Sequence, residues 1–167
     1  MSATALFFAA CLIQTQQTQP DAEAGKARLE AALKATELNF SKSSSGISFR
    51  LEFTSEAKNR IVFAANEPYG ILSSQIHAVY TTVWTSKEKP SDALMLKVAT
   101  MARKLGGFYG FKDAQGSYAI RFGVHYDISD LPANPNKDMA SIKRLKDMIY
   151  FVNQVGQEAE KELAGQT

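Results

Sequence analysis

Cysteine and clustered positive charge are almost absent from this sequence of 167 residues. With a single cysteine, Cys11, the chain cannot form an intramolecular disulfide. A chain of this length can remove roughly two thirds of its unfolded surface from water, so it needs neither a disulfide nor a metal to fold. The formal net charge is only +2, and the densest basic stretch, residues 137–146, follows a helical pattern. Both observations argue against a nucleic-acid-binding protein, whose cations gather on one face.

Recognisable catalytic motifs are missing as well. The sequence contains no nucleophile elbow, zinc-protease, EF-hand or Walker pattern. Cys11 lies in an N-terminal apolar segment, and a mature chain without that segment has neither a catalytic thiol nor a cysteine-ligated zinc site. The serines at 43–45 have no recognisable base partner. We therefore expect no cofactor and no enzymatic activity.

Only one long apolar run is present, ATALFFAACLI at residues 3–13. It is shorter than the roughly 20 residues that a membrane-spanning helix needs, and its length is typical of the apolar region of a secretory signal peptide. Ala22 and Ala24 then form an A-x-A cleavage pattern before Gly25. The sequence therefore predicts a signal peptide at residues 1–24 and export to the bacterial periplasm or beyond.

Two alternatives for this N-terminal segment stay open. Residues 1–4 contain no Lys or Arg, where a signal peptide normally carries positive charge, so the run could instead be an apolar segment retained in a cytoplasmic protein. Cys11 follows Phe8-Ala9-Ala10, which resembles a bacterial lipobox. Lipidation at Cys11 is the one way in which we expect this chain to contact a membrane.

The rest of the chain has the composition of one globular domain, with 45% hydrophobic and 22% charged residues. Hydrophobic periodicity divides it into helices and strands. Helices are predicted at 22–38, at 94–105 with its start signal at Pro90, Ser91 and Asp92, and from Asn134-Pro135 to Leu163. Strands are predicted at 47–54, from 61, at 72–84, from 108 and at 118–128, with a Pro/Gly turn at 66–70. The order α-β-β-β-α-β-β-α predicts an α+β fold in which helices cover the apolar face of an antiparallel five-stranded sheet.

Each predicted helix carries its apolar residues along one side. These stripes consist of Leu29, Ala32, Leu33 and Thr36 in the first helix; Leu94, Val98, Met101, Ala102 and Leu105 in the second; and Ile142, Leu145, Ile149, Val152, Val155 or Gly156, Ala159 and Leu163 in the last. We expect all three stripes to face the core.

Two of the strands show strict alternation between an apolar and a polar face. Ile47, Phe49, Leu51 and Phe53 alternate with Ser48, Arg50, Glu52 and Thr54. Tyr118, Ile120, Phe122, Val124, Tyr126 and Ile128 alternate with Ala119, Arg121, Gly123, His125 and Asp127. Trp84, at the end of the third predicted strand, is expected to close an edge of the core. Opposite charges on the polar face are expected to pair across strands.

Four glycines lie close together in RKLGGFYGFKDAQGSYAIRF, residues 103–122. A phosphate-binding loop would lie between a strand and the following helix, so that the helix N-terminus faces the anion. Here Gly106 and Gly107 follow a predicted helix and precede a strand, where glycine ends a helix in a left-handed conformation. Gly116 is expected to take a positive φ in the turn at 112–117. The glycines are therefore predicted to be joints.

The joint and the strand after it resemble a known family. Leu105-Gly106-Gly107-Phe108, Asp113, Gly116 and the strand Tyr118-Ala119-Ile120 look like the second half of the YbjN-like bacterial proteins. That family is similar in fold to the type III secretion chaperones, and the resemblance covers about residues 25–163 of a domain placed at 25–167. It implies no catalytic residue. It implies a binding or regulatory module, because chaperones of this fold pair up and hold extended segments of client proteins.

His125 and Asp127 are the one pair that suggests chemistry. Two residues apart on a strand, they share a face, where they could orient an imidazole or supply two metal ligands. A metal site needs at least a third ligand, and the sequence does not place His77, the other histidine, beside them. A small enzyme or metal-binding protein built on this pair is the alternative to a binding module.

The function predicted from the sequence is non-catalytic binding of a protein or peptide by an exported domain, which could also pair with a second copy. The predicted partner-binding face consists of Arg50, Glu52, Arg121, Gly123 and His125. Ala119 and Gly123 are small, so they are expected to let another chain approach closely. If the N-terminal segment is retained, a cytoplasmic regulator is predicted instead.

Overall fold

The computed structural model describes residues 19–43, 48–55, 58–69, 74–101, 105–113, 115–127 and 139–165. This part of the chain has an α+β fold with three helices and one six-stranded antiparallel sheet. The α+β class is therefore confirmed, and the sheet has one strand more than predicted. Most of the predicted signal peptide, including Cys11, lies outside the described residues, as does the predicted helix start at Asn134-Pro135.

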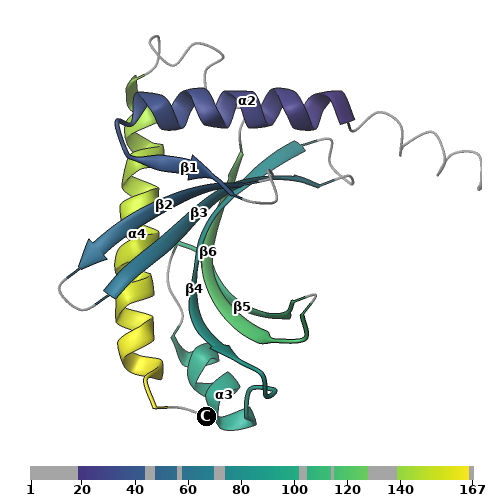
Figure 1. Ribbon diagram of the computed structural model, residues 1–167, viewed down its shortest axis with the longest axis vertical. Helices are drawn as coiled ribbons and strands as arrows, with labels where there is room; N and C mark the ends of the chain where they lie inside the picture. Colours follow the sequence, from purple (N-terminus) through teal and green to yellow (C-terminus); the bar gives the residue numbers. More distant parts are fainter. Residues whose placement is uncertain are drawn as a thin grey trace, which may run out of the picture.

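The sheet runs in the order β1-β2-β3-β4-β6-β5, and every neighbouring pair is antiparallel. The strands are β1 (Phe40–Lys42), β2 (Ser48–Ser55), β3 (Lys58–Tyr69), β4 (Ser74–Ser86), β5 (Gly107–Lys112) and β6 (Tyr118–Asp127). The helices are α2 (Gln19–Ala35), α3 (Asp92–Thr100) and α4 (Met139–Leu163). Figure 1 shows α4 running along the sheet, α2 crossing its upper end and the strands β4, β6 and β5 curving below.

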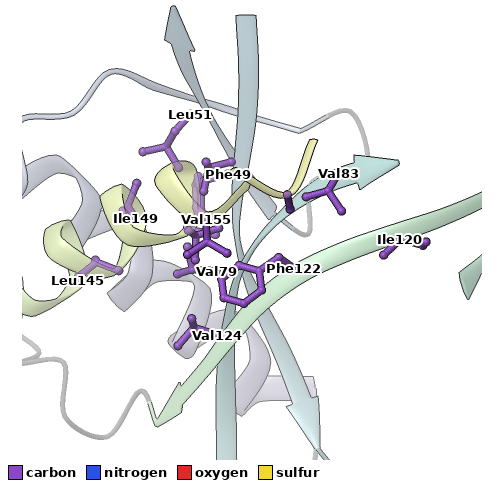
Figure 2. Packing of buried hydrophobic residues seen from close by; sticks show 14 of the residues in the cluster. Phe49, Leu51, Val79, Val83, Ile120, Phe122, Val124, Leu145, Ile149 and Val155 are labelled. Carbon is purple, nitrogen blue, oxygen red and sulfur yellow. The ribbon is translucent and has the colours of Figure 1, made fainter. Parts of the chain in front are cut away.

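One hydrophobic core joins all three helices to one face of the sheet. Figure 2 shows this packing, with the sheet residues Phe49, Leu51, Val79, Phe122 and Val124 beside Leu145, Ile149 and Val155 of α4. Burying one large apolar side chain is worth about 1.5–3 kcal/mol, so this cluster determines which side of the sheet faces inwards. We call this side the helix-covered face and the opposite side the outer face. Trp84 packs against the core at its margin, as predicted.

The apolar stripes predicted on α2 and α4 are confirmed. Leu29, Ala32, Leu33 and Thr36 are buried, as are Ile142, Leu145, Ile149, Val152, Val155, Gly156, Ala159 and Leu163. Helix α2 ends three residues before the predicted boundary, because the Thr36 hydroxyl donates to the Leu33 carbonyl at 2.7 Å and Glu37 takes a left-handed φ of 62°. No helix in the described residues has the length and apolar character that a membrane crossing needs.

The sixth strand, β1, is the one that the sequence did not reveal. It is three residues long and pairs with β2 through Phe40↔Leu51, too short for an alternation to be recognised. The Phe40 ring meets the Phe49 ring edge-on at 5.6 Å between centroids. Glu30 of α2 also contacts β1, with its carboxylate 3.1 Å from the Nζ of Lys42 and 3.2 Å from that of Lys34. These hydrogen bonds, that from Lys42 first, lower the pKa of Glu30 from its usual value of 4.5.

The Pro/Gly turn predicted at 66–70 is wrong in its first four residues, which continue β3 as far as Tyr69. Asn66 to Tyr69 pair with β4, and Pro68 lies opposite Gln75. The pairing of β2 with β3 stops at Ala65, so this part of β3 has only one neighbouring strand among the described residues. A proline is tolerated there because its missing N–H can face the open side.

Helix α3 begins where it was predicted and ends earlier. Ser91 caps it, its hydroxyl accepting from the Leu94 N–H at 3.2 Å. The helix stops at Thr100, short of the predicted Leu105, which is 66% exposed and takes no part in the core. Gly106 and Gly116 have positive φ values of 100° and 86°, whereas Gly107 does not. Gly106 and Gly116 therefore have the positive φ predicted for them. The predicted role of Gly106 in ending the helix is wrong, because α3 ends at Thr100 with Met101 as its C-cap, and Gly107 is the first residue of β5.

Candidate functional site

The outer face of the sheet carries an aromatic cluster of its own. Ala78 and Tyr80 of β4 are buried there together with the half-buried Phe63 of β3, and this cluster is separate from the core. The rings of Phe63 and Tyr80 stack with centroids 5.3 Å apart. No residue of a described helix belongs to the cluster.

Register explains why these rings meet. Phe63 lies opposite Tyr80, and Tyr80 lies opposite Gly123, so one row of cross-strand partners runs over three strands. Tyr109 of β5 lies opposite Arg121 of β6, one position further along. The aromatic–arginine cluster defined by this register consists of Phe63, Tyr80, Tyr109, Phe111 and Arg121.

Arg121 is held between two aromatic rings. Its guanidinium carbon lies 4.0 Å from the ring centroid of Phe111 and 4.4 Å from that of Tyr80. Both distances are well within the roughly 6 Å over which a cation is attracted to an aromatic face. The Nε–H of Arg121 is shielded from solvent and has no hydrogen-bond partner among the described residues. The side chain is half-buried, so its charge is partly desolvated.

Gly123 is not the open surface that the sequence predicts. It is buried, and a Cβ atom built on it would lie 3.2 Å from Cε1 of Tyr109 and 3.2 Å from Cβ of Tyr80. The small residue makes room for the two tyrosines rather than for another chain. Ala119 is also buried, at 6% exposure, so a partner would meet aromatic rings on this face.

The other residues of the predicted binding face are more dispersed. Arg50 and Glu52 form an ion pair within β2, 3.0 Å between Nη2 and Oε1, where a cross-strand pair was expected. Both side chains are more than two fifths exposed, at 42% and 57%, so the pair contributes little to stability. Ser48 is buried rather than exposed and donates to the Ser43 hydroxyl at 3.0 Å.

A small pocket opens where β3 and β4 separate. Their pairing ends at Val62↔Thr81, and the Thr81 hydroxyl donates to the Ile61 carbonyl at 2.7 Å. The pocket has a volume of about 210 Å³ and is lined by Arg60, Ile61, Phe63, Thr82 and Glu160. Phe63 belongs to the aromatic–arginine cluster, and Thr82 is the cross-strand partner of Arg121. The pocket is therefore adjacent to this cluster.

Arg60 and Glu160 form the inner wall of this pocket. Two contacts join them, 3.0 Å from Nη1 to Oε1 and 2.7 Å from Nη2 to Oε2. The Arg60 side chain is 6% exposed, so the carboxylate neutralises a guanidinium that would otherwise be buried alone. Gly156 leaves space for this pair, because a Cβ there would lie 2.5 Å from Cγ2 of Thr81 and 3.0 Å from Nη1 of Arg60.

Strand β5 forms one edge of the sheet, beside the aromatic–arginine cluster. Its only neighbour among the described residues is β6, so no described strand pairs with its other edge, where another strand could add. Gly107 and Gly110 are exposed, and nothing lies within 4 Å of a Cβ built at Gly107. The opposite edge, β1, is only three residues long, so β5 offers the longer template for an added strand.

The structure does not assemble a catalytic or metal site around His125. The imidazole of His125 is exposed, and the side chain of Asp127 lies outside what the structure describes. His125 is the cross-strand partner of Ala78, whereas His77 is the partner of Tyr126, so the two histidines are not opposite each other. Within the described residues, no group of three or more His, Cys, Asp or Glu side chains could hold a metal ion.

Sequence reasoning singled out Arg121 and missed the rings around it. Phe63, Tyr80 and Phe111 were predicted to lie in strands, but they were not assigned to either face of the sheet. A signal was available at Phe111, because the pairing Phe111↔Ala119 places it on the face of Arg121, but that register depends on the length of the turn.

Comparison with known proteins gives no match: no family model fits the chain, and no curated protein and no solved structure is detectably similar to it.

Proposed function

We propose that this chain is an exported, non-catalytic binding module whose outer face and β5 edge hold an extended segment of another protein. The observation that carries this proposal is the aromatic–arginine cluster beside a sheet edge, β5, that has no second neighbouring strand among the described residues. An extended peptide can add a strand to such an edge, where backbone hydrogen bonds provide affinity and neighbouring side chains provide specificity. The exposed glycines of β5 leave its edge open to that approach.

The composition of the cluster supports binding over a purely structural role. Aromatic residues and arginine are enriched at the energetic centres of protein interfaces. Phe63, Tyr109 and Phe111 are all half-buried, so each keeps surface that a partner can cover.

The remaining features of this proposal come from the sequence. The likeness of residues 105–120 to YbjN-like proteins, and of that family to type III secretion chaperones, supports a module that pairs with a second copy or holds client segments. The apolar run at residues 3–13 supports export to the periplasm or beyond. Mass spectrometry of the protein purified from its native cells tests export: we expect an N-terminus after residue 13, near Gly25, and an intact Met1 or Ser2 would contradict it.

A displayed library of random peptides tests the binding function directly. We expect the full chain to enrich peptides over an unrelated folded protein. In a synthetic version of an enriched peptide, N-methylation should abolish binding at every second residue, because alternate N–H groups of an added strand face the sheet.

Two ring deletions serve as a matched pair in this assay. Phe63→Ser removes a ring stacked at 5.3 Å on Tyr80 of the outer face, and Tyr150→Ser removes one at 5.7 Å from Phe53 on the side of α4. We expect Phe63→Ser to weaken peptide binding roughly tenfold and Tyr150→Ser to leave it unchanged, with circular dichroism confirming that both variants are folded. Failure to enrich any peptide, or equal affinities for the two variants, would contradict the proposal.

A further inference from the structure

Arg121 differs from the other arginines of the sheet in its lack of an acidic partner. Arg50 pairs with Glu52 at 3.0 Å and Arg60 with Glu160 at 2.7 Å. No carboxylate among the described residues forms an ion pair with Arg121. A guanidinium that is partly buried without an anion is unfavourable. Arg121 is held in that state, so its guanidinium is able to bind an anion from another molecule.

The geometry around Arg121 restricts where that anion can approach. Phe111 and Tyr80 lie against the guanidinium, with ring centroids 4.0 and 4.4 Å from its carbon, so an anion must approach from the directions that these rings leave open. The N–H groups of a guanidinium point outwards in its plane, where two of them match the two oxygens of a carboxylate. The two rings hold the side chain in place, so less entropy is lost when a carboxylate binds.

The charge of the site favours a carboxylate over a phosphate. Phosphate groups carry nearly two negative charges and are usually bound by clusters of cations. On the outer face, the other described arginine, Arg50, is already paired with Glu52. The single free charge of Arg121 is balanced by the single charge of an Asp or Glu side chain.

We propose that Arg121 binds the carboxylate of an aspartate or glutamate side chain in an extended peptide on the outer face. This inference rests on the proposed binding function and adds to it the chemistry of the ligand. The pocket lined by Phe63 and Thr82 lies next to this position, because Thr82 is the cross-strand partner of Arg121. The 210 Å³ of this pocket gives room for a neighbouring side chain of the same peptide.

The peptide library provides the first test, because its peptides are displayed with no free C-terminal carboxylate. We expect selection on the full chain to enrich Asp or Glu at one peptide position. In the synthetic, C-terminally amidated peptide, replacing that acid by its amide should weaken binding roughly tenfold to hundredfold, the value of a hydrogen-bonded charge. If only peptides with a free C-terminus bind, the carboxylate comes from a chain end and the side-chain proposal is wrong.

Variants of the protein assign the effect to one guanidinium. Arg121→Met keeps an apolar stem between the rings. It should bind the acidic peptide roughly tenfold to hundredfold more weakly than the wild type does, and it should bind the amide peptide with the same affinity as the wild type. Arg28→Met removes an exposed charge from α2, away from the outer face, and should change binding by less than about threefold.

A measurement on the unaltered protein covers the case in which Arg121→Met fails to fold. The Nε–H of Arg121 is shielded and without a partner, so its NMR signal should shift on adding the acidic peptide and not on adding the amide peptide. Selected peptides without an enriched acid, or an amide peptide that binds as well as the acid, would overturn the role of Arg121 and leave the binding function standing. If no peptide is selected at all, the binding function and this inference both fail.

Discussion

Replacing Gly106 by alanine is the substitution for which the structure gives the sharpest expectation. Gly106 has a φ of 100°, and a Cβ atom there would lie 2.5 Å from the Gly123 carbonyl oxygen. It would also lie 2.9 Å from Cζ of Phe122 and 2.9 Å from Cγ2 of Val124. The carbonyl cannot move aside alone, because Gly123 is paired on both sides, with Tyr80 and with Gly107.

Two costs add at this position. A non-glycine residue in a sparsely populated backbone region costs about 1–3 kcal/mol, and overpacking costs about 1–3 kcal/mol more. We therefore expect Gly106→Ala to lower the free energy of unfolding by about 2–5 kcal/mol. For a chain of this size each kcal/mol corresponds to about 2–4 °C, so the melting temperature should fall by about 5–20 °C.

Gly107 provides the control, one residue away. Its φ is not in the left-handed region, and no atom lies within 4 Å of a Cβ built on it. Gly107→Ala should therefore leave the fold intact and could stabilise it by about 0.4–1 kcal/mol, by restricting the unfolded chain. The two alanine variants are expected to change stability in opposite directions.

Urea denaturation followed by the fluorescence of Trp84 measures both effects. Trp84 is the single tryptophan and is half-buried at the margin of the core, so its emission should report the global transition. The change in free energy follows from the midpoint if the slope is unchanged. A Gly106→Ala protein that unfolds at the same urea concentration as Gly107→Ala, or a higher one, would refute the argument.

Two further predictions concern ion pairs. Glu160→Gln leaves the buried guanidinium of Arg60 without an anion and should lower the free energy of unfolding by about 1–3 kcal/mol. Glu52→Gln, in the exposed pair with Arg50, should lower it by less than about 1 kcal/mol. Equal urea midpoints for the two variants would contradict the structural role of Glu160. The folded state lowers the pKa of Glu30. The stability that Glu30 adds is therefore fully present when the pH is above the usual pKa of 4.5, and it is lost as the pH falls through the lower pKa of the folded state. The stability difference between the wild type and Glu30→Gln should thus shrink on acidification below pH 4.5, and a difference independent of pH would exclude this linkage.

The sequence determined the parts of this protein that depend on local periodicity. The stripes of α2 and α4 were predicted residue by residue, because positions three and four apart necessarily share one side of a helix. The alternation in β2 and β6 identified the helix-covered face for the same reason, with a period of two. The positive φ of Gly106 was predicted from its place between a helix and a strand, although the helix ends before it, at Thr100.

Tertiary structure decided which residues meet across strands. Arg60 pairs with Glu160, 100 residues away in the chain, and no local pattern could indicate that contact. The same holds for β1, for the continuation of β3 through Pro68, and for the tyrosines that fill the space above Gly123. Register between strands is set by turns and by packing over long sequence separations. For this reason the sequence could place Arg121 on a face, and only the folded sheet could place it between Tyr80 and Phe111.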